Sequence, residues 1–237
     1  MSIETNINEV ITKVKQLSRK NFDNRLKVKI LAVSKKKSRE DIVKAYKAGL
    51  SDFGENYIDE GLEKIKFFKN LDLGINWHFI GSIQSNKTRQ IAENFDWVHS
   101  VDSLKVVKRL GMQRPEHMKP LNILLQLNLG REDSKSGVQP DELNPIIYEI
   151  EKYKNLSFRG LMTIPENYKE PKVVKFRFLS LSEVQSKLIA SLPPHYVDSV
   201  DSISMGMSND FDLAIEASNP IFQTIIRIGT SIFGQRT

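Results

Sequence analysis

The stretch VKILAVS, at residues 28–34, decides the fold class. It is short, apolar on both faces and contains β-branched residues, which is typical of a strand buried between two layers. A helix is expected on either side of it. Ile3, Ile7, Val10 and Leu17 recur at helical spacing before the strand. After it, Ser38 is placed to cap a helix that ends near Gly49.

The same alternation of strand and helix continues along the chain. Further strands are predicted at 52–54, 76–80, 97–101, 121–129, 158–163, 202–205 and 224–228. Eight strand-then-helix units after one extra N-terminal helix predict an α/β fold, a single (β/α)8 TIM-type barrel. An open, doubly wound sheet is the alternative. No linker or low-complexity segment interrupts the pattern, so we expect residues 1–237 to form a single domain.

Composition excludes several classes of protein. The 237 residues are 40% hydrophobic and 27% charged, as in ordinary globular proteins, and include no cysteine. Disulfides, a thiol nucleophile and Cys-based zinc sites are therefore excluded, and we predict no metal site. The first residues lack the pattern of a signal peptide, and no apolar run approaches the roughly 20 residues that span a bilayer. We expect a cytoplasmic monomer without a membrane partner.

The positive charge is uneven. Residues 1–120 hold 23 Lys and Arg against 15 Asp and Glu, whereas residues 121–237 hold 12 against 14. A basic half suits nucleic acid or an anionic small molecule, but a solvated lysine-rich surface is the simpler interpretation. The basic residues are scattered and form no run interleaved with aromatics, so no nucleic-acid partner is expected.

In such barrels the functional residues lie where strands end. Strand alternation puts Leu31, Val33 and Lys35 on one face, so Lys35 points into the barrel rim if Val33 points inward. A lysine there is costly unless it is used or paired. Lys35 is thus a candidate Schiff-base amine, and a generic basic loop is the alternative.

Polar residues follow other strands as well. Asn56 and His78 lie near the ends of the second and third strands, where turn formation and a structural role are the alternatives. Small residues follow the seventh and eighth strands, and this is the usual phosphate site of the fold. The residues in these two places are Ser204, Met205, Gly206, Arg227, Gly229 and Thr230. A phosphorylated carbonyl compound held as an imine fits, which leaves a phospho-sugar lyase and a pyridoxal-phosphate protein open.

Seven motifs, in order, resemble the YggS/PROSC family of pyridoxal-phosphate homeostasis proteins. They are LAVSKKK at 31–37, DFGENY at 52–57, WHFIGSIQSNK at 77–87, SKSG at 134–137, RGLMTI at 159–164, SMGMSNDFDLAI at 204–215 and RIGTSIFG at 227–234. The resemblance spans nearly all of residues 28–234. One departure is the Lys35-Lys36-Lys37 run, where family members often have Thr at the second position.

The resemblance implies a fold like the N-terminal barrel of alanine racemase. It implies pyridoxal 5′-phosphate bound as a Schiff base to Lys35, with Arg227 beside the pyridine nitrogen and Lys135 as a secondary lysine. Phosphate contacts would come from Ser204, the backbone of Met205 and Gly206, and Gly229 and Thr230. His78 and Asn56 would line the cofactor pocket.

The implied arginine bears on function. A guanidinium stays charged and accepts no proton, so it disfavours the protonated pyridine that serves as an electron sink. In alanine racemases a tyrosine from another domain supplies the opposed acid or base, and from the short stretch after Ile228 we expect no such domain here. Our hypothesis is a protein that holds and delivers the cofactor, with apoenzymes as candidate partners. A low-activity amino-acid racemase is the alternative.

Overall fold

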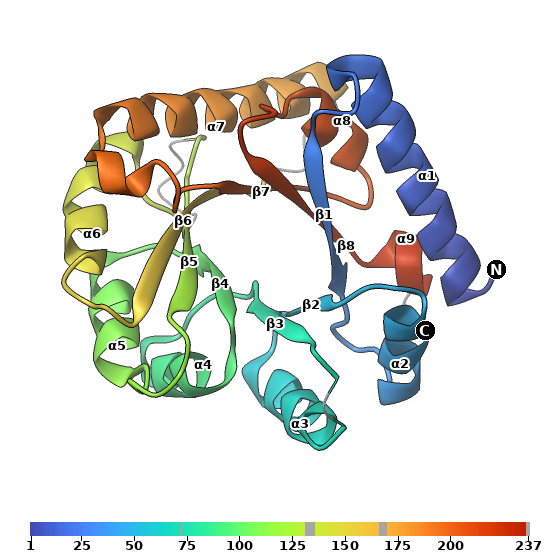
Figure 1. Cartoon of the computed structure of the whole chain (residues 1–237), viewed down its shortest axis with the longest axis horizontal. Helices are drawn as coiled ribbons and strands as arrows, with labels where there is room; N and C mark the ends of the chain where they lie inside the picture. Colours follow the sequence, from blue (N-terminus) through green and yellow to red (C-terminus); the bar gives the residue numbers. More distant parts are fainter. Residues whose placement is uncertain (72, 131–135, 166–169, 236–237) are drawn as a thin grey trace.

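Eight parallel strands close into a barrel in the order β1 to β8 in the computed structural model, which describes residues 1–71, 73–130, 136–165 and 170–235 (Figure 1). The barrel closes because β1 pairs with β8 over six residue pairs, from Lys27↔Gln223 to Ala32↔Ile228. This closure confirms the predicted (β/α)8 barrel and excludes the open sheet. The strands are β1 Lys27–Val33, β2 Asp52–Glu55, β3 Asn76–Phe79, β4 Trp97–Val101, β5 Leu121–Gln126, β6 Leu156–Met162, β7 Ser202–Met207 and β8 Gln223–Ile228.

The helices form a ring outside the strands (Figure 1). The α-helices are α1 Ile3–Phe22, α2 Arg39–Lys47, α3 Ile58–Lys69, α4 Thr88–Asn94, α5 Leu104–Gln113, α6 Leu143–Ile150, α7 Pro171–Ser191, α8 Phe211–Glu216 and α9 Thr230–Phe233. Short 3-10 turns occupy Ser85–Lys87, Pro140–Glu142 and Pro194–Tyr196. The additional helix α1 contacts α2, α8 and α9, so it covers the seam where the first and last strands meet.

Local sequence explains the ends of these elements. The Ser38 hydroxyl accepts the N–H of Asp41 at 3.2 Å, which makes Ser38 the predicted cap of α2. Gly49 follows that helix with φ +95°, a left-handed conformation that glycine adopts without a Cβ penalty. After β8 the chain forms the one-turn helix α9.

Several strand boundaries differ from the sequence prediction by one residue, and β7 ends two residues later than predicted, at Met207. The end of β5 and the start of β6 show two further differences. Strand β5 ends at Gln126, and the next residue, Leu127, pairs with Val138 in an isolated bridge while its N–H donates to Met162 O of β6. Strand β6 begins at Leu156, two residues earlier than predicted, where it pairs with Leu121. Both differences follow from partners distant in sequence, which local apolar patterns do not reveal.

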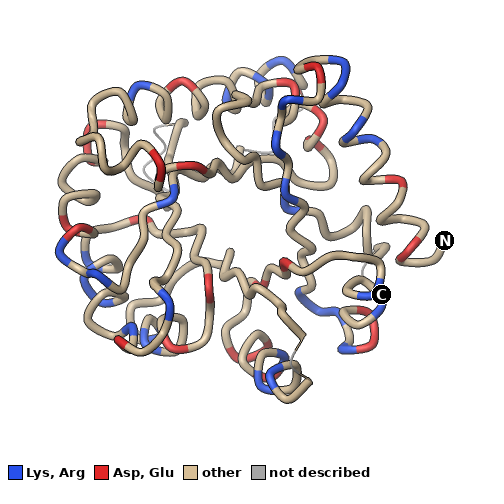
Figure 2. Tube along the Cα trace, viewed as in Figure 1, with Lys and Arg blue, Asp and Glu red and all other residues tan. Residues whose placement is uncertain are grey.

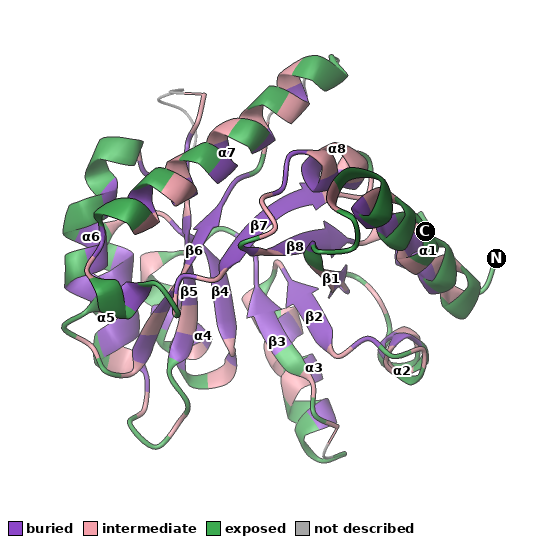
Figure 3. Cartoon of the chain, turned by 45° about the horizontal axis from the view of Figure 1, so that its top comes forward, coloured by how far each residue is buried: buried purple, intermediate pink, exposed green. Residues whose placement is uncertain are grey.

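The core has two layers. The larger lies between the barrel and the helices, and Figure 3 shows the strands buried while the outward helix faces are exposed. The smaller lies inside the barrel and contains Leu31, Ile80, Trp97, Leu124, Met162 and Ile225, with Val33 packed against it. Buried polar side chains, including His78 and His99, lie on the strands beside this apolar group.

Charged residues are spread around the ring of helices. Figure 2 shows Lys and Arg segments alternating with Asp and Glu segments. Among the helices that the structure describes, none has the length and apolar character needed to cross a bilayer.

Candidate functional site

A cavity of about 510 Å³ opens where the strands end, the position that the barrel fold predicts. Its size lies within the range of cofactor and small-ligand sites. It is lined by the ends of β1 and β8, the segments after β2 and β7, and the start of α7. The lining residues are Val33, Lys35, Lys37, Asn56, Ile80, Ile164, Pro171, Val174, Met207, Ser208, Asn209, Asp210, Leu213, Arg227, Gly229, Thr230 and Gly234.

Strand alternation places Lys35 in the cavity wall. Leu31 and Val33 belong to the apolar group inside the barrel, whereas Ala32 belongs to the outer layer. Residue 35 continues the inward series two positions after Val33 and lines the cavity, as the alternation predicts.

Four residues fix the chain on both sides of Lys35, and we call them the Lys35 clamp: Ser34, Glu55, Glu60 and Lys64. The Lys64 ammonium, on α3, donates to Ser34 O at 2.7 Å, Glu55 Oε1 at 2.8 Å and Glu60 Oε1 at 2.7 Å. Ser34 Oγ donates to Glu55 Oε1 at 2.6 Å, and the Lys36 N–H donates to Glu60 Oε1. Both neighbours of Lys35 are therefore anchored.

The Lys35 clamp is buried and ionic. Glu55 is fully buried and Lys64 is 5% exposed. Burial raises the pKa of the Glu55 carboxyl, and the Lys64 charge opposes that shift. All three Lys64 protons have acceptors, as a buried ammonium requires. The clamp also holds Lys36 at φ +59°, which turns the chain away from β1.

Arg227 lies at the end of β8 and is 4% exposed. Its Nη1 donates to Ser204 Oγ at 2.7 Å and its Nη2 donates to Thr163 O at 2.9 Å. Burial lowers the pKa of Arg227 to about 10, against the raising effect of Asp210, so the guanidinium remains charged at neutral pH. It presents a fixed cation to the cavity.

The rim between β7 and β8 collects backbone donors. The N–H groups of Gly229 and Ser231 both donate to Ser208 Oγ, at 3.2 and 3.3 Å. These two N–H groups therefore converge on one oxygen atom. A phosphate oxygen also needs hydrogen-bond donors of this kind. Gly229 and Thr230 line this part of the cavity.

Asn56 supplies a polar atom without a protein partner. Its side-chain Oδ1 is buried and makes no hydrogen bond within the described structure. Buried polar atoms are nearly always paired, so an unpaired one in a cavity wall indicates a position for a ligand group.

Four predicted site residues lie outside the cavity lining. His78 and Ser204 are fully buried inside the barrel, where His78 binds Asp52 and His99 while Ser204 binds His99 and Arg227. Met205 packs in the outer layer. Gly206 has φ +87° and lies against α8. Their predicted contacts with a cofactor stay predictions, and the predicted secondary residue Lys135 lies outside the described residues.

Sequence reasoning missed several residues that shape the site. Ser208 is one, although the Ser and Gly pattern that indicated the phosphate region extends to it. Glu55 and Lys64 of the clamp are others, and the FGEN motif was the available signal for Glu55. No sequence pattern marked His99 as a site residue, because it lies in a five-residue strand in which every residue is buried.

A profile of the family described as "Alanine racemase, N-terminal domain" matches residues 6–237. The "Pyridoxal phosphate homeostasis protein" of Vibrio cholerae serotype O1 is 44% identical over 99% of this chain and 97% of its own length. The protein of that name from Escherichia coli K12 is 42% identical over 88% of this chain and 86% of its own. The chain belongs to the pyridoxal phosphate homeostasis protein family.

Solved structures agree with this family assignment. PipY of Synechococcus elongatus, with pyridoxal phosphate bound, superposes with a TM-score of 0.79 at 28% identity, and the match covers 98% of this chain and 100% of PipY. Alanine racemase from Corynebacterium glutamicum, at 14% identity and a TM-score of 0.60, shares the barrel over 61% of its length. The homeostasis protein family thus uses the barrel of the racemases.

Proposed function

We propose that this protein binds pyridoxal 5′-phosphate as a Schiff base on Lys35 and acts inside the cell in homeostasis and delivery of that cofactor, without substantial turnover. Residues 1–237 would serve as one cofactor-binding domain. The observation that carries the proposal is a cavity whose walls combine a lysine just after β1 with a buried guanidinium on β8 and the N–H groups of the turn that follows β8. PipY, a structural relative, has this cofactor bound.

The residues of the cavity fit each part of the cofactor. The unprotonated Lys35 amine would add to the aldehyde carbon and water would leave, which forms the imine. The Gly229–Ser231 turn and Ser208 would hold the phosphate. The unpaired Oδ1 of Asn56 marks a place for a polar group of the ring. When bound, the group supplies an electron sink for amino-acid chemistry.

The position of Arg227 supports storage more than catalysis. A guanidinium beside the pyridine nitrogen favours the unprotonated ring, because it can donate but cannot accept a proton. An unprotonated ring withdraws electrons weakly, so imines of amino acids would react slowly. The names of the relatives from Vibrio cholerae and Escherichia coli agree with a storage role, since both are called homeostasis proteins. Apoenzymes that require the cofactor would be the partners.

Reduction and peptide mapping test the covalent site. The protein is mixed with pyridoxal phosphate, reduced with borohydride, digested and analysed by mass spectrometry. We expect the reduced adduct on Lys35, its loss in Lys35→Ala, and its retention in Lys36→Ala, a control for the neighbouring lysine. An adduct that persists at full yield in Lys35→Ala would show that the site assignment is wrong.

Proton exchange separates a carrier from a racemase. Alanine is incubated with the loaded protein in deuterated water, and incorporation of deuterium at the α-carbon is followed by NMR. A carrier gives no exchange above the rate of free cofactor. Exchange that Lys35→Ala abolishes would favour the racemase.

A further inference from the structure

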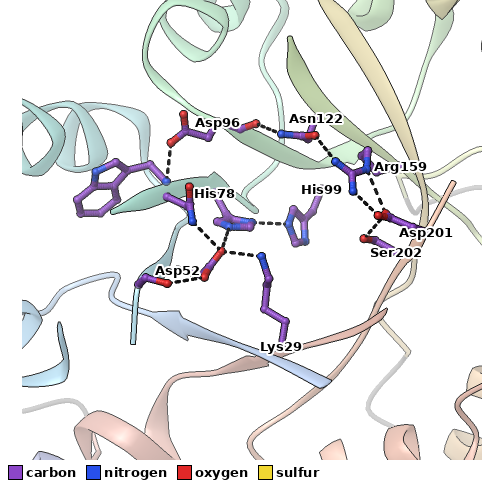
Figure 4. A network of polar contacts seen from close by, with 12 residues as sticks. Lys29, Asp52, His78, Asp96, His99, Asn122, Arg159, Asp201 and Ser202 are labelled. Carbon is purple, nitrogen blue, oxygen red and sulfur yellow. Dashed lines mark hydrogen bonds and ion pairs between the residues drawn. The ribbon is translucent and has the colours of Figure 1, made fainter. Parts of the chain in front are cut away.

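A continuous series of hydrogen bonds crosses the barrel interior from the cavity to the opposite end. Arg227 Nη1 contacts Ser204 Oγ at 2.7 Å, and Ser204 Oγ contacts His99 Nδ1 at 3.0 Å. His99 Nε2 then contacts His78 Nδ1 at 2.9 Å, and His78 Nε2 contacts Asp52 Oδ1 at 3.0 Å. Figure 4 shows the part from His99 through His78 to Asp52. We call these five residues the interior chain.

The interior chain is shielded from water and comes from five strands. His78, His99 and Ser204 are fully buried, Arg227 is 4% exposed and Asp52 is 7% exposed. Its members lie on β8, β7, β4, β3 and β2. The two histidines are 21 residues apart in sequence, and His99 and Ser204 are 105 apart. Only the folded barrel brings these residues together.

The chemistry of the two ends fixes every proton between them. A carboxylate only accepts, so His78 must carry its proton on Nε2. A neutral His78 then accepts at Nδ1, and His99 must donate from Nε2. His99 therefore accepts at Nδ1 from the Ser204 hydroxyl.

The Arg227 end of the chain requires the same proton positions. A guanidinium only donates, so Ser204 Oγ accepts from Arg227. Within the described residues, the remaining partner of Ser204 Oγ is His99, so its single O–H points there. Both ends thus require the same tautomers.

We infer that Asp52, His78, His99 and Ser204 form a one-way hydrogen-bond chain that positions the Arg227 guanidinium, with both imidazoles neutral and protonated on Nε2. His78 and His99 are then positioning residues, and they do not act as acids or bases. Each hydrogen bond within the chain is donated in the direction away from the cavity. The chain offers no group that can take a proton from a ligand beside Arg227.

The charges around the two rings are consistent with neutral imidazoles. His78 faces Asp52, Lys29 and Asp96, and it stacks on Trp97 with ring centroids 5.3 Å apart. His99 faces His78, Arg227 and Lys29. Burial lowers the pKa of both histidines, and for His99 the nearby cations add to that effect. A second proton on either ring would place two hydrogen-bond donors opposite each other.

If the proposed function holds, the interior chain explains how the cofactor stays unreactive. The interior chain fixes the Arg227 guanidinium, which donates hydrogen bonds. A ligand atom that approaches it must therefore accept a hydrogen bond and must carry no proton of its own. The unprotonated pyridine nitrogen meets this requirement. This part of the inference rests on the proposed function, whereas the tautomers do not.

Imidazole tautomers can be measured on the free protein. The chain has four histidines, and the exposed pair His117 and His195 can be replaced by Gln to leave the two of interest. Long-range ¹H–¹⁵N correlation spectra at pH 7 should show Nε2 protonated and Nδ1 unprotonated on both rings. A ring protonated on Nδ1, or an imidazolium at this pH, overturns the inference.

Two substitutions at His99 test whether the chain positions Arg227. Asn offers Oδ1 as an acceptor near the place of Nδ1, whereas Leu offers none. Exchange of the Arg227 guanidinium protons, followed by ¹⁵N NMR without cofactor, should rise about tenfold in His99→Leu and stay within about threefold in His99→Asn, since a buried hydroxyl without an acceptor weakens the contact. Equal exchange in His99→Leu and wild type overturns the inference.

Adding pyridoxal phosphate separates the two proposals. The wild-type tautomers should persist in the loaded protein, and the dissociation constant should rise about tenfold in His99→Leu, matching the exchange result. If wild type fails to bind the cofactor but shows the stated tautomers, the proposed function fails and the interior chain stands. If wild type binds and the tautomers differ, the interior chain fails alone.

Discussion

Arg227 and Ser204 lie on neighbouring strands, and Arg227 Nη1 donates a hydrogen bond to Ser204 Oγ at 2.7 Å. This contact joins the cavity wall to the barrel interior, because Ser204 is fully buried while Arg227 lines the cavity. Ser204 therefore influences a bound ligand indirectly, through its hydrogen bond with Arg227.

Removing the Ser204 hydroxyl should weaken cofactor binding. In Ser204→Ala the guanidinium loses an acceptor, and a hydrogen bond to a charged group contributes about 1.5–3 kcal/mol. We expect the dissociation constant for pyridoxal phosphate, from absorbance titration, to rise about tenfold or more. Ser182→Ala is the matched control, since Ser182 Oγ is buried and donates to Ala217 O at 2.9 Å outside the barrel. Equal affinities in the two variants would contradict the role of Ser204.

Breaking the Lys35 clamp should destabilise the protein and slow adduct formation. Lys64→Met leaves Glu55 buried without its cation, which costs about 3–5 kcal/mol in unfolding free energy. The second change Glu55→Gln should recover part of that stability, because it removes the buried charge. Lys66→Met, at an exposed position of the same helix, serves as control and should change urea unfolding by less than about 0.5 kcal/mol.

Acid should destabilise the fold through the buried histidines. The folded-state pKa values of His78 and His99 lie below the ordinary value. The unfolded chain therefore binds more protons below about pH 6.5, and stability falls as pH falls from there toward the folded pKa. Each ring contributes a slope of about 1.4 kcal/mol per pH unit in that window. Urea unfolding at several pH values should show a shallower slope in His99→Asn than in wild type.

A methyl group at Gly206 should be costly. Its Cβ would lie 2.6 Å from the Ala214 Cβ, and the residue has φ +87°. Gly49 has a similar φ of +95° but open space around its Cβ position, so Gly49→Ala measures the backbone cost alone. We expect Gly206→Ala to lose about 1–3 kcal/mol more unfolding free energy than Gly49→Ala. Similar losses would mean that α8 moves aside freely.

The order of the helices and strands was predictable because short stretches of sequence determine it. Apolar runs such as residues 28–34 mark buried strands, and Ser38 and Gly49 mark the ends of the helix that follows. Alternation along β1 also carried the prediction from Val33 to the position of Lys35 in the cavity wall. These signals depend on neighbours a few residues apart.

The interior of the barrel was not predictable in the same way. His99 forms its contacts with residues 21 and 105 positions away, and no periodicity encodes such pairs. No feature of the sequence distinguishes Lys64 from the other lysines of its helix, yet it is 5% exposed and donates to Ser34 O. Ser204 lies on β7 and is fully buried, whereas Ser208 follows that strand and lines the cavity, and the sequence pattern does not show where β7 ends.

The pairing of β1 with β8 has a consequence for the timing of assembly in the cell. Lys35 leaves the ribosome early, but Arg227 and Gly229, which line the same cavity, follow almost 200 residues later, roughly 10 to 40 s at ordinary rates of translation. Under the proposed function, a nascent chain would expose the Lys35 amine before the barrel could hold the phosphate of an anionic aldehyde beside it. Cofactor loading would then follow synthesis and closure of the barrel.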